Sequence, residues 1–99
     1  MTLPNKVRGE VVLDIDGAPR RLCVTLGALA ELEAAFDVAS FAELGARLAA
    51  LTASDLITVI SALLQGEAMT PAQIASSRID PQEAAHAVAE AFRLAFDDA

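Results

Sequence analysis

The spacing of the apolar residues changes once along this chain, at about residue 26. Before that point apolar and polar side chains alternate, as at Val11, Leu13 and Ile15. After it, apolar residues recur every three or four positions, as at Leu29 and Leu32. The first spacing is typical of strands with one buried face and the second of amphipathic helices. We therefore predict an α+β fold, with an N-terminal antiparallel β-hairpin followed by a compact bundle of four to five short helices.

The hairpin is expected between residues 6 and 26. Its two alternating runs are separated by the sequence Asp-Gly-Ala-Pro at residues 16–19. Glycine adopts positive φ at little cost and proline has no N–H for the ladder, so these four residues are predicted to form the turn. A two-stranded hairpin is marginally stable in water. Its apolar face is therefore expected to rest on the helices.

Helix-start signals divide the rest of the chain. Thr25 is the expected N-cap of the first helix, and Ser40 with Glu43 forms a capping-box pattern for the second. A polar run at 52–55 precedes a widely apolar segment, which is expected to be the central helix. Proline-containing starts near residues 70 and 80 predict two more helices. The expected apolar stripes are Leu26, Leu29, Leu32, Ala35 and Phe36, then Leu44, Leu48 and Leu51, then Leu56, Ile57, Ile60, Leu63 and Leu64, and finally Ala84, Ala85, Val88, Phe92, Ala95 and Phe96.

The length and apolar content indicate one folded unit. A chain of 99 residues is too short for two independent cores. Residues 1–99 are therefore expected to form a single domain, with the hairpin at 6–26 and a helical region at 27–97. Apolar residues make up 55% of the chain and aromatic residues only 4%, so the core is expected to consist of Leu, Val, Ile and Ala.

The charge balance argues against two classes of partner. Seven basic residues stand against fourteen acidic ones, for a net charge of −7. Such a surface repels nucleic-acid phosphates and anionic lipid headgroups, so neither nucleic acid nor a membrane is an expected partner. The first residues lack the apolar run of a secretory signal, and no apolar run approaches the roughly 20 residues that span a bilayer. With a single cysteine, which suits a reducing compartment, the protein is expected to be cytoplasmic.

No group of residues has the spacing of a catalytic or metal site. Asp14 and Asp16 begin like a calcium loop, but no Glu follows where the bidentate ligand belongs. The only histidine, His86, and the only cysteine, Cys23, have no second ligand or base at a suitable spacing. Ser54 stands before its aspartate, the reverse of the serine motif of acyl carrier proteins, and is interpreted as a helix cap. We therefore predict a non-enzymatic protein with no catalytic, cofactor-binding or metal-binding residues and no cofactor.

Two stretches resemble a known family. They are Arg-Gly-Glu-Val at 8–11 and Leu-Gly-Ala-Leu-Ala-Glu-Leu-Glu at 26–33, the latter followed by Ala-Ala-Phe at 34–36. In this order they resemble the phage tail assembly chaperone family of the gene-transfer-agent type, also labelled a tail tube family. Its members are short proteins from phage-like gene clusters of alphaproteobacteria. Asp-Leu-Ile at 55–57 and an alanine-rich last helix match the family's layout, so the resemblance spans nearly the whole chain.

The resemblance implies a role in assembly without catalysis. A tail assembly chaperone binds the long helical tape-measure protein, keeps it soluble and helps to recruit tail-tube subunits around it. The implied partners are therefore the tape-measure protein and tail-tube subunits. One alternative is a structural tail or tail-tube component, although tube subunits usually contribute an extended sheet and strand signal is confined here to the first quarter. A second is an unrelated regulatory or enzyme-associated domain acting through Cys23 or His86.

Candidate partner-binding residues lie near the end of the chain. Phe92 and Phe96 are one helical turn apart, where aromatic side chains make good anchors. The alternative is that both close the hydrophobic core, and the same alternatives apply to Phe41. Unpaired hairpin edges offer another contact, by strand addition or self-association, so a homo-oligomer stays open. Arg20 and Arg21 blunt one of these edges.

Overall fold

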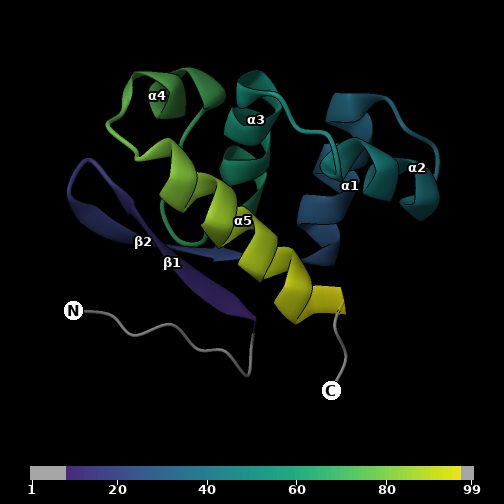
Figure 1. Ribbon diagram of the computed structural model, residues 1–99, viewed down its shortest axis with the longest axis horizontal. Helices are drawn as coiled ribbons and strands as arrows, with labels where there is room; N and C mark the ends of the chain where they lie inside the picture. The colour runs from purple at the N-terminus through teal and green to yellow at the C-terminus, as the bar shows by residue number, and fades with distance from the viewer. Residues whose placement is uncertain (1–8, 97–99) are drawn as a thin grey trace.

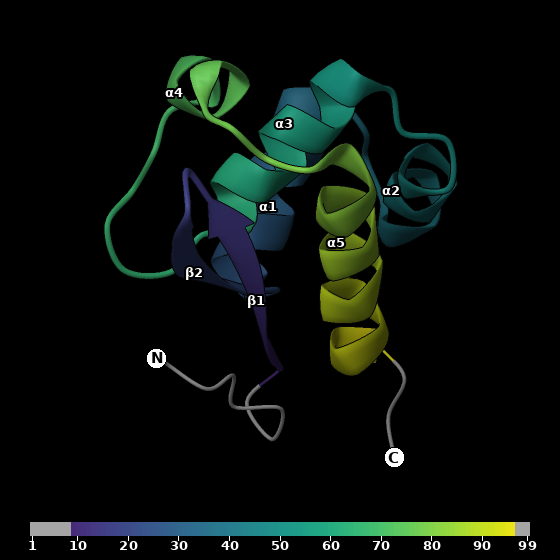
Figure 2. The same ribbon diagram turned by 60° about the vertical axis from the view of Figure 1, so that its left-hand side comes forward.

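The computed structural model describes residues 9–96 of the chain and shows two strands followed by five helices. In chain order they are β1 (Glu10–Ile15), β2 (Ala18–Cys23), α1 (Leu26–Phe36), α2 (Phe41–Leu48), α3 (Ala53–Leu63), α4 (Pro71–Ser76) and α5 (Pro81–Phe96). The predicted α+β fold is confirmed. Residues 6–8 of the expected hairpin and residue 97 of the expected helical region lie outside the described residues. Helix α3 contacts α1, α4, α5 and β2, and α5 crosses the hairpin (Figures 1 and 2).

The hairpin turn is shorter than the four residues predicted. Ile15 pairs with Ala18, so only Asp16 and Gly17 form the turn, with φ of 55° and 81°. Two successive positive φ values are typical of the type I′ turn, whose twist matches that of the strands it joins.

The prediction that proline stands outside the ladder was wrong. Pro19 lies in β2, opposite Asp14. Because Ile15 and Ala18 form the hydrogen-bonded pair that closes the turn, the next pair along is a non-hydrogen-bonded one. An N–H at position 19 would point away from β1, so the missing donor of proline costs no bond in this ladder.

The predicted helix starts are largely confirmed, because each depends on a local hydrogen bond. Thr25 Oγ1 accepts from the N–H of Ala28 at 3.0 Å. Capping boxes are complete for α3, between Thr52 and Asp55, and for α4, between Thr70 and Gln73. The cap of α3 is thus Thr52 and not Ser54, and in α2 the Glu43 carboxylate accepts from Ala39 instead of closing its box on Ser40.

The core lies between the hairpin and helices α1, α3 and α5. The apolar face of the hairpin is covered as predicted, since Leu13, Ile15 and Leu22 are buried. The helices add their own buried side chains, among them Leu32, Val59 and Leu63 with no exposed surface, together with Ala28, Leu29, Leu44, Ile60, Ile74, Ala84, Ala87, Val88 and Ala91.

Several residues of the expected stripes are exposed. Leu26 is 80% exposed, because the buried stripe of α1 runs through Ala28, Leu29 and Leu32 and leaves this first-turn residue beside it. Ala35 is exposed as well. In α5 the buried face is Ala84, Ala87, Val88 and Ala91, so Ala85, Ala95 and Phe96 face outward. Among residues 9–96, no helix combines the length and hydropathy needed to cross a lipid bilayer.

Candidate functional site

An apolar groove of about 450 Å³ lies between α2, the start of α3 and the outward side of α5. Helix α5 forms one wall of this groove, with residues spaced by three and four positions along one side of the helix. Among the described residues that line the groove, Thr52 is the only polar one. The lining residues are Gly45, Leu48, Leu51, Thr52, Ala53, Leu56, Ala85, Val88, Ala89, Phe92 and Phe96. We call this feature the α2–α5 groove.

The two phenylalanines of α5 lie at this groove in different environments. Their rings are stacked, with centroids 6.1 Å apart and planes 6° from parallel. Phe92 is half-buried and packs against the core. Phe96 is 59% exposed. The pair therefore forms a continuous aromatic surface that leads from the core to the solvent.

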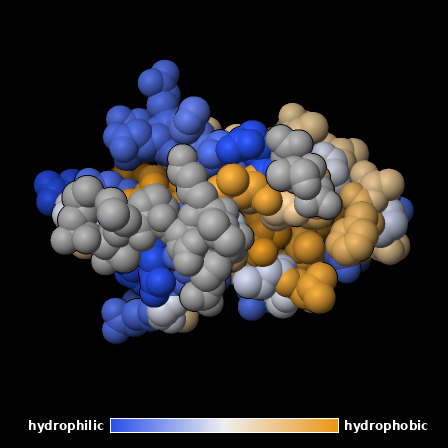
Figure 3. Space-filling model, turned by 90° about the horizontal axis from the view of Figure 1, so that it is seen from below, coloured by the Kyte–Doolittle hydropathy of each residue, from blue (hydrophilic) through white to orange (hydrophobic). Residues whose placement is uncertain are grey.

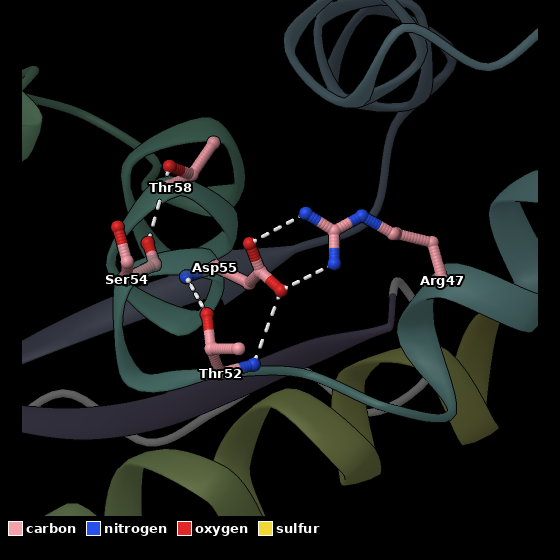
Figure 4. A network of polar contacts seen from close by, with 5 residues as sticks. All are labelled: Arg47, Thr52, Ser54, Asp55 and Thr58. Carbon is pink, nitrogen blue, oxygen red and sulfur yellow. Dashed lines mark hydrogen bonds and ion pairs between the residues drawn. The ribbon is translucent and has the colours of Figure 1, made fainter.

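One polar network holds α2 against α3 (Figure 4). The guanidinium group of Arg47 donates two hydrogen bonds to the carboxylate of Asp55, at 2.7 and 2.9 Å. The same guanidinium lies 4.8 Å from the ring centroid of Phe36 at the end of α1, which is a cation–π distance. These contacts fix the position of α2 and therefore the width of the α2–α5 groove.

Asp55 also closes the first turn of α3. Its Oδ2 accepts from the backbone N–H of Thr52 at 3.1 Å. This hydrogen bond is the main reason that the pKa of Asp55 is lowered, and the Thr52 hydroxyl and Arg47 lower it further against the opposing effect of burial. Asp55 is therefore an anion at neutral pH. Its carboxylate both caps the first turn of α3 and forms the ion pair with Arg47.

The groove has room at its α2 wall. A Cβ atom added to Gly45 would have no heavy atom within 4 Å outside the helix itself. Leu48, Leu51 and Leu56, which the sequence places in core stripes, pack against the core but are only half-buried, and they also line the groove. The sequence did give one sign of such a groove, because its apolar helix stripes are wider than so small a core can bury. It does not show which of these stripes stays exposed.

The chemically reactive residues lie apart from this groove. His86 is exposed on another side of α5, and Cys23 is half-buried at the end of β2. Asp16 uses its carboxylate to accept the backbone N–H of Arg78 at 2.7 Å. Within residues 9–96, no three His, Cys, Asp or Glu side chains are grouped so that they could hold a metal ion.

Hydrophobic surface is concentrated on one part of the molecule. Seen from below, apolar colours predominate on the right-hand part, the side of α1, α2 and the end of α5, while most of the coloured atoms on the left-hand part are hydrophilic (Figure 3). Exposed Leu26, Phe41 and Phe96 belong to these three helices. Contiguous exposed apolar surface is typical of sites that contact another protein.

Comparison with known proteins identifies the family. No curated protein and no solved structure was found to match. A family model described as "Phage tail tube protein, GTA-gp10" matches residues 8–98, which is nearly the whole chain. The resemblance noted in residues 8–36 is thereby confirmed, and the chain belongs to this family of phage tail proteins.

Proposed function

We propose that this protein is a non-enzymatic, cytoplasmic tail assembly chaperone that binds the tape-measure protein and assists assembly of the tail tube. The observation that carries the proposal is the α2–α5 groove, in which ten of the eleven described lining residues are apolar or glycine. An amphipathic helix can place its apolar face in such a groove. A tape-measure protein consists of long helices whose apolar stripes need covering before the tail is built.

Phe96 is the proposed anchor for that helix, with Phe92 as the base on which it stacks. Exposed aromatic side chains at the rim of an apolar groove contribute strongly to binding because they lose much apolar surface to the partner. A net charge of −7 on the rest of the chain supports the same role, since it keeps the chaperone and its bound client soluble.

The test is coexpression with the tape-measure protein of the same gene cluster. We expect the chaperone to raise the soluble yield of the tape-measure protein and to copurify with it. Phe96→Asp should abolish both effects without unfolding the chaperone, because this side chain is largely exposed. An unchanged soluble yield with the natural chain would contradict the proposal.

A matched pair of variants tests the groove itself. Gly45→Gln places a side chain in the open space of the groove wall, whereas Ala46→Gln places the same side chain on the neighbouring exposed position, which does not line the groove. We expect only the first to prevent copurification. Equal effects of the two variants would mean that the groove is not the binding site.

The second candidate is a structural component of the tail, and the family description, which names a tail tube protein, favours it. The described strands are two of six residues each, which is little sheet for the wall of a tube. Quantifying the protein in purified particles separates the candidates. A chaperone should be nearly absent, while a tube subunit should be present at a fixed high ratio to the other tail proteins.

A further inference from the structure

The two edges of the hairpin differ. In this two-residue hairpin, hydrogen-bonded and non-hydrogen-bonded pairs alternate from the turn, so Val11, Leu13 and Ile15 bond to β2. The backbone groups of Val12 and Asp14 therefore point away from β2. Within residues 9–96, these outward N–H and C=O groups bond to no other group.

The outer edge of β2 is closed. Its Arg21 carbonyl accepts the N–H of Gln65 at 2.9 Å, and Leu22 forms an isolated antiparallel bridge with Leu64. Pro19 has no N–H to offer on that side. Three features keep an edge strand from pairing with another chain: a covering segment, proline and basic side chains. All three are found on β2.

A groove runs beside the open edge. It encloses about 370 Å³ between β1, at Val11, Val12 and Leu13, and the side of α5 that carries Gln82, Glu83 and His86. An edge strand with a helix alongside it is the arrangement in which an extended peptide adds a strand to a sheet, because the strand supplies hydrogen bonds and the helix supplies side-chain contacts.

We propose that the outer edge of β1 binds an extended, basic segment of a partner protein by strand addition, with α5 as the facing wall. The charge at the groove selects the occupant. Glu83 lines the groove, and Asp14 of β1 lies with Glu83 and Arg78 at an adjoining hollow. Neither of the two carboxylates forms an ion pair within residues 9–96. Lysine or arginine side chains opposite them would be stabilised, while acidic ones would be repelled.

A second copy of this chain fits the edge poorly. Antiparallel pairing of two β1 strands centred on Val12 pairs the most outward-facing residues and puts Asp14 of one copy opposite Glu10 of the other. Like charges directly opposite on paired strands are destabilising. Each copy also has a net charge of −7. A basic partner segment avoids both penalties.

Amide NMR of the full chain tests this proposal with a blocked nonapeptide that alternates lysine and valine. In the free protein, the amides of Val12 and Asp14 should exchange rapidly with solvent, and those of Leu13 and Ile15 slowly. The peptide should protect Val12 and Asp14 and shift the neighbouring resonances of α5. A peptide alternating glutamate and valine should bind at least about tenfold more weakly at low salt.

Two variants make the outcome specific. Val12→Pro removes the outward N–H without removing a bond to β2 and should weaken peptide binding about tenfold or more, while Val12→Thr should change it less than about twofold. Phe96→Asp should leave peptide binding unchanged, which separates this edge from the α2–α5 groove. Protection of Val12 that depends on protein concentration without peptide would assign the edge to a second copy and overturn the proposal. So would peptide shifts confined to the α2–α5 groove, or no binding by the natural chain.

Discussion

Arg47 on α2 and Asp55 on α3 face each other across the loop that joins these helices, and both oxygens of the carboxylate accept from the guanidinium group. Such a two-point contact fixes orientation as well as distance. Only a tenth of the Asp55 side chain is exposed, against 40% for Arg47. The pair thus sets the angle of α2 at the candidate binding groove.

Arg47→Met should destabilise the protein and loosen α2. The variant keeps the apolar stem but leaves the mostly covered Asp55 without its cationic partner. Arg93→Met is the control, because Arg93 and Glu90 form a more exposed pair three residues apart on one helix, a type worth about 0.3–0.5 kcal/mol. Urea midpoints should fall further for Arg47→Met, with faster amide exchange in α2. Equal midpoints would mean that the Arg47–Asp55 contact contributes no more than a surface pair.

Acid should remove part of the stability through Asp55. Its pKa in the folded protein lies below the ordinary value of 3.8, so ionisation favours folding. This contribution is present above that value and is lost as the pH falls through the folded-state pKa. Between about pH 5 and about pH 2, the natural chain should therefore lose more of its free energy of unfolding than Asp55→Asn does. Parallel pH profiles of the two proteins would contradict the assignment.

Two leucines of α1 should respond very differently to truncation. Leu32 has no exposed surface, so Leu32→Ala should lower the free energy of unfolding by about 2–5 kcal/mol. Leu26 is 80% exposed, so Leu26→Ala should change it by less than about 0.5 kcal/mol. Chemical denaturation measures both. A large decrease in the free energy of unfolding for Leu26→Ala would mean that this residue is buried in the core, as its spacing suggests.

Adding one methyl group to each of two glycines should have opposite effects. Gly17 has a φ of 81° in the hairpin turn, so Gly17→Ala should cost about 1–2 kcal/mol of stability. Gly45 lies inside α2 beside open space, so Gly45→Ala should stabilise by up to about 1 kcal/mol. Thermal unfolding compares the two variants directly. A Gly17→Ala midpoint equal to that of the natural chain would argue against the type I′ turn.

Local chemistry explains which parts of the fold could be predicted. The starts of α1, α3 and α4 depend on side chains that bond within three residues, as Thr70 does with Gln73. The hairpin turn was predicted to be too long. Whether Pro19 can lie in the ladder depends on whether its position is a hydrogen-bonded or a non-hydrogen-bonded one, and composition does not show this. The spacing of Phe92 and Phe96 indicated them as candidate binding residues. The sequence did not indicate that Leu48 and Leu51 form the opposite wall of the α2–α5 groove.

The sequence by itself determined the order of strands and helices, most helix starts and the family, because periodicity, capping and motif are properties of neighbouring residues. The tertiary structure alone decided which apolar surface stays open. Leu48 and Leu63 look alike in a helical pattern, but one lines a groove and the other has no exposed surface. The difference arises because burial depends on where distant elements pack, here on the Arg47–Asp55 contact and on the side of α5 that meets the hairpin.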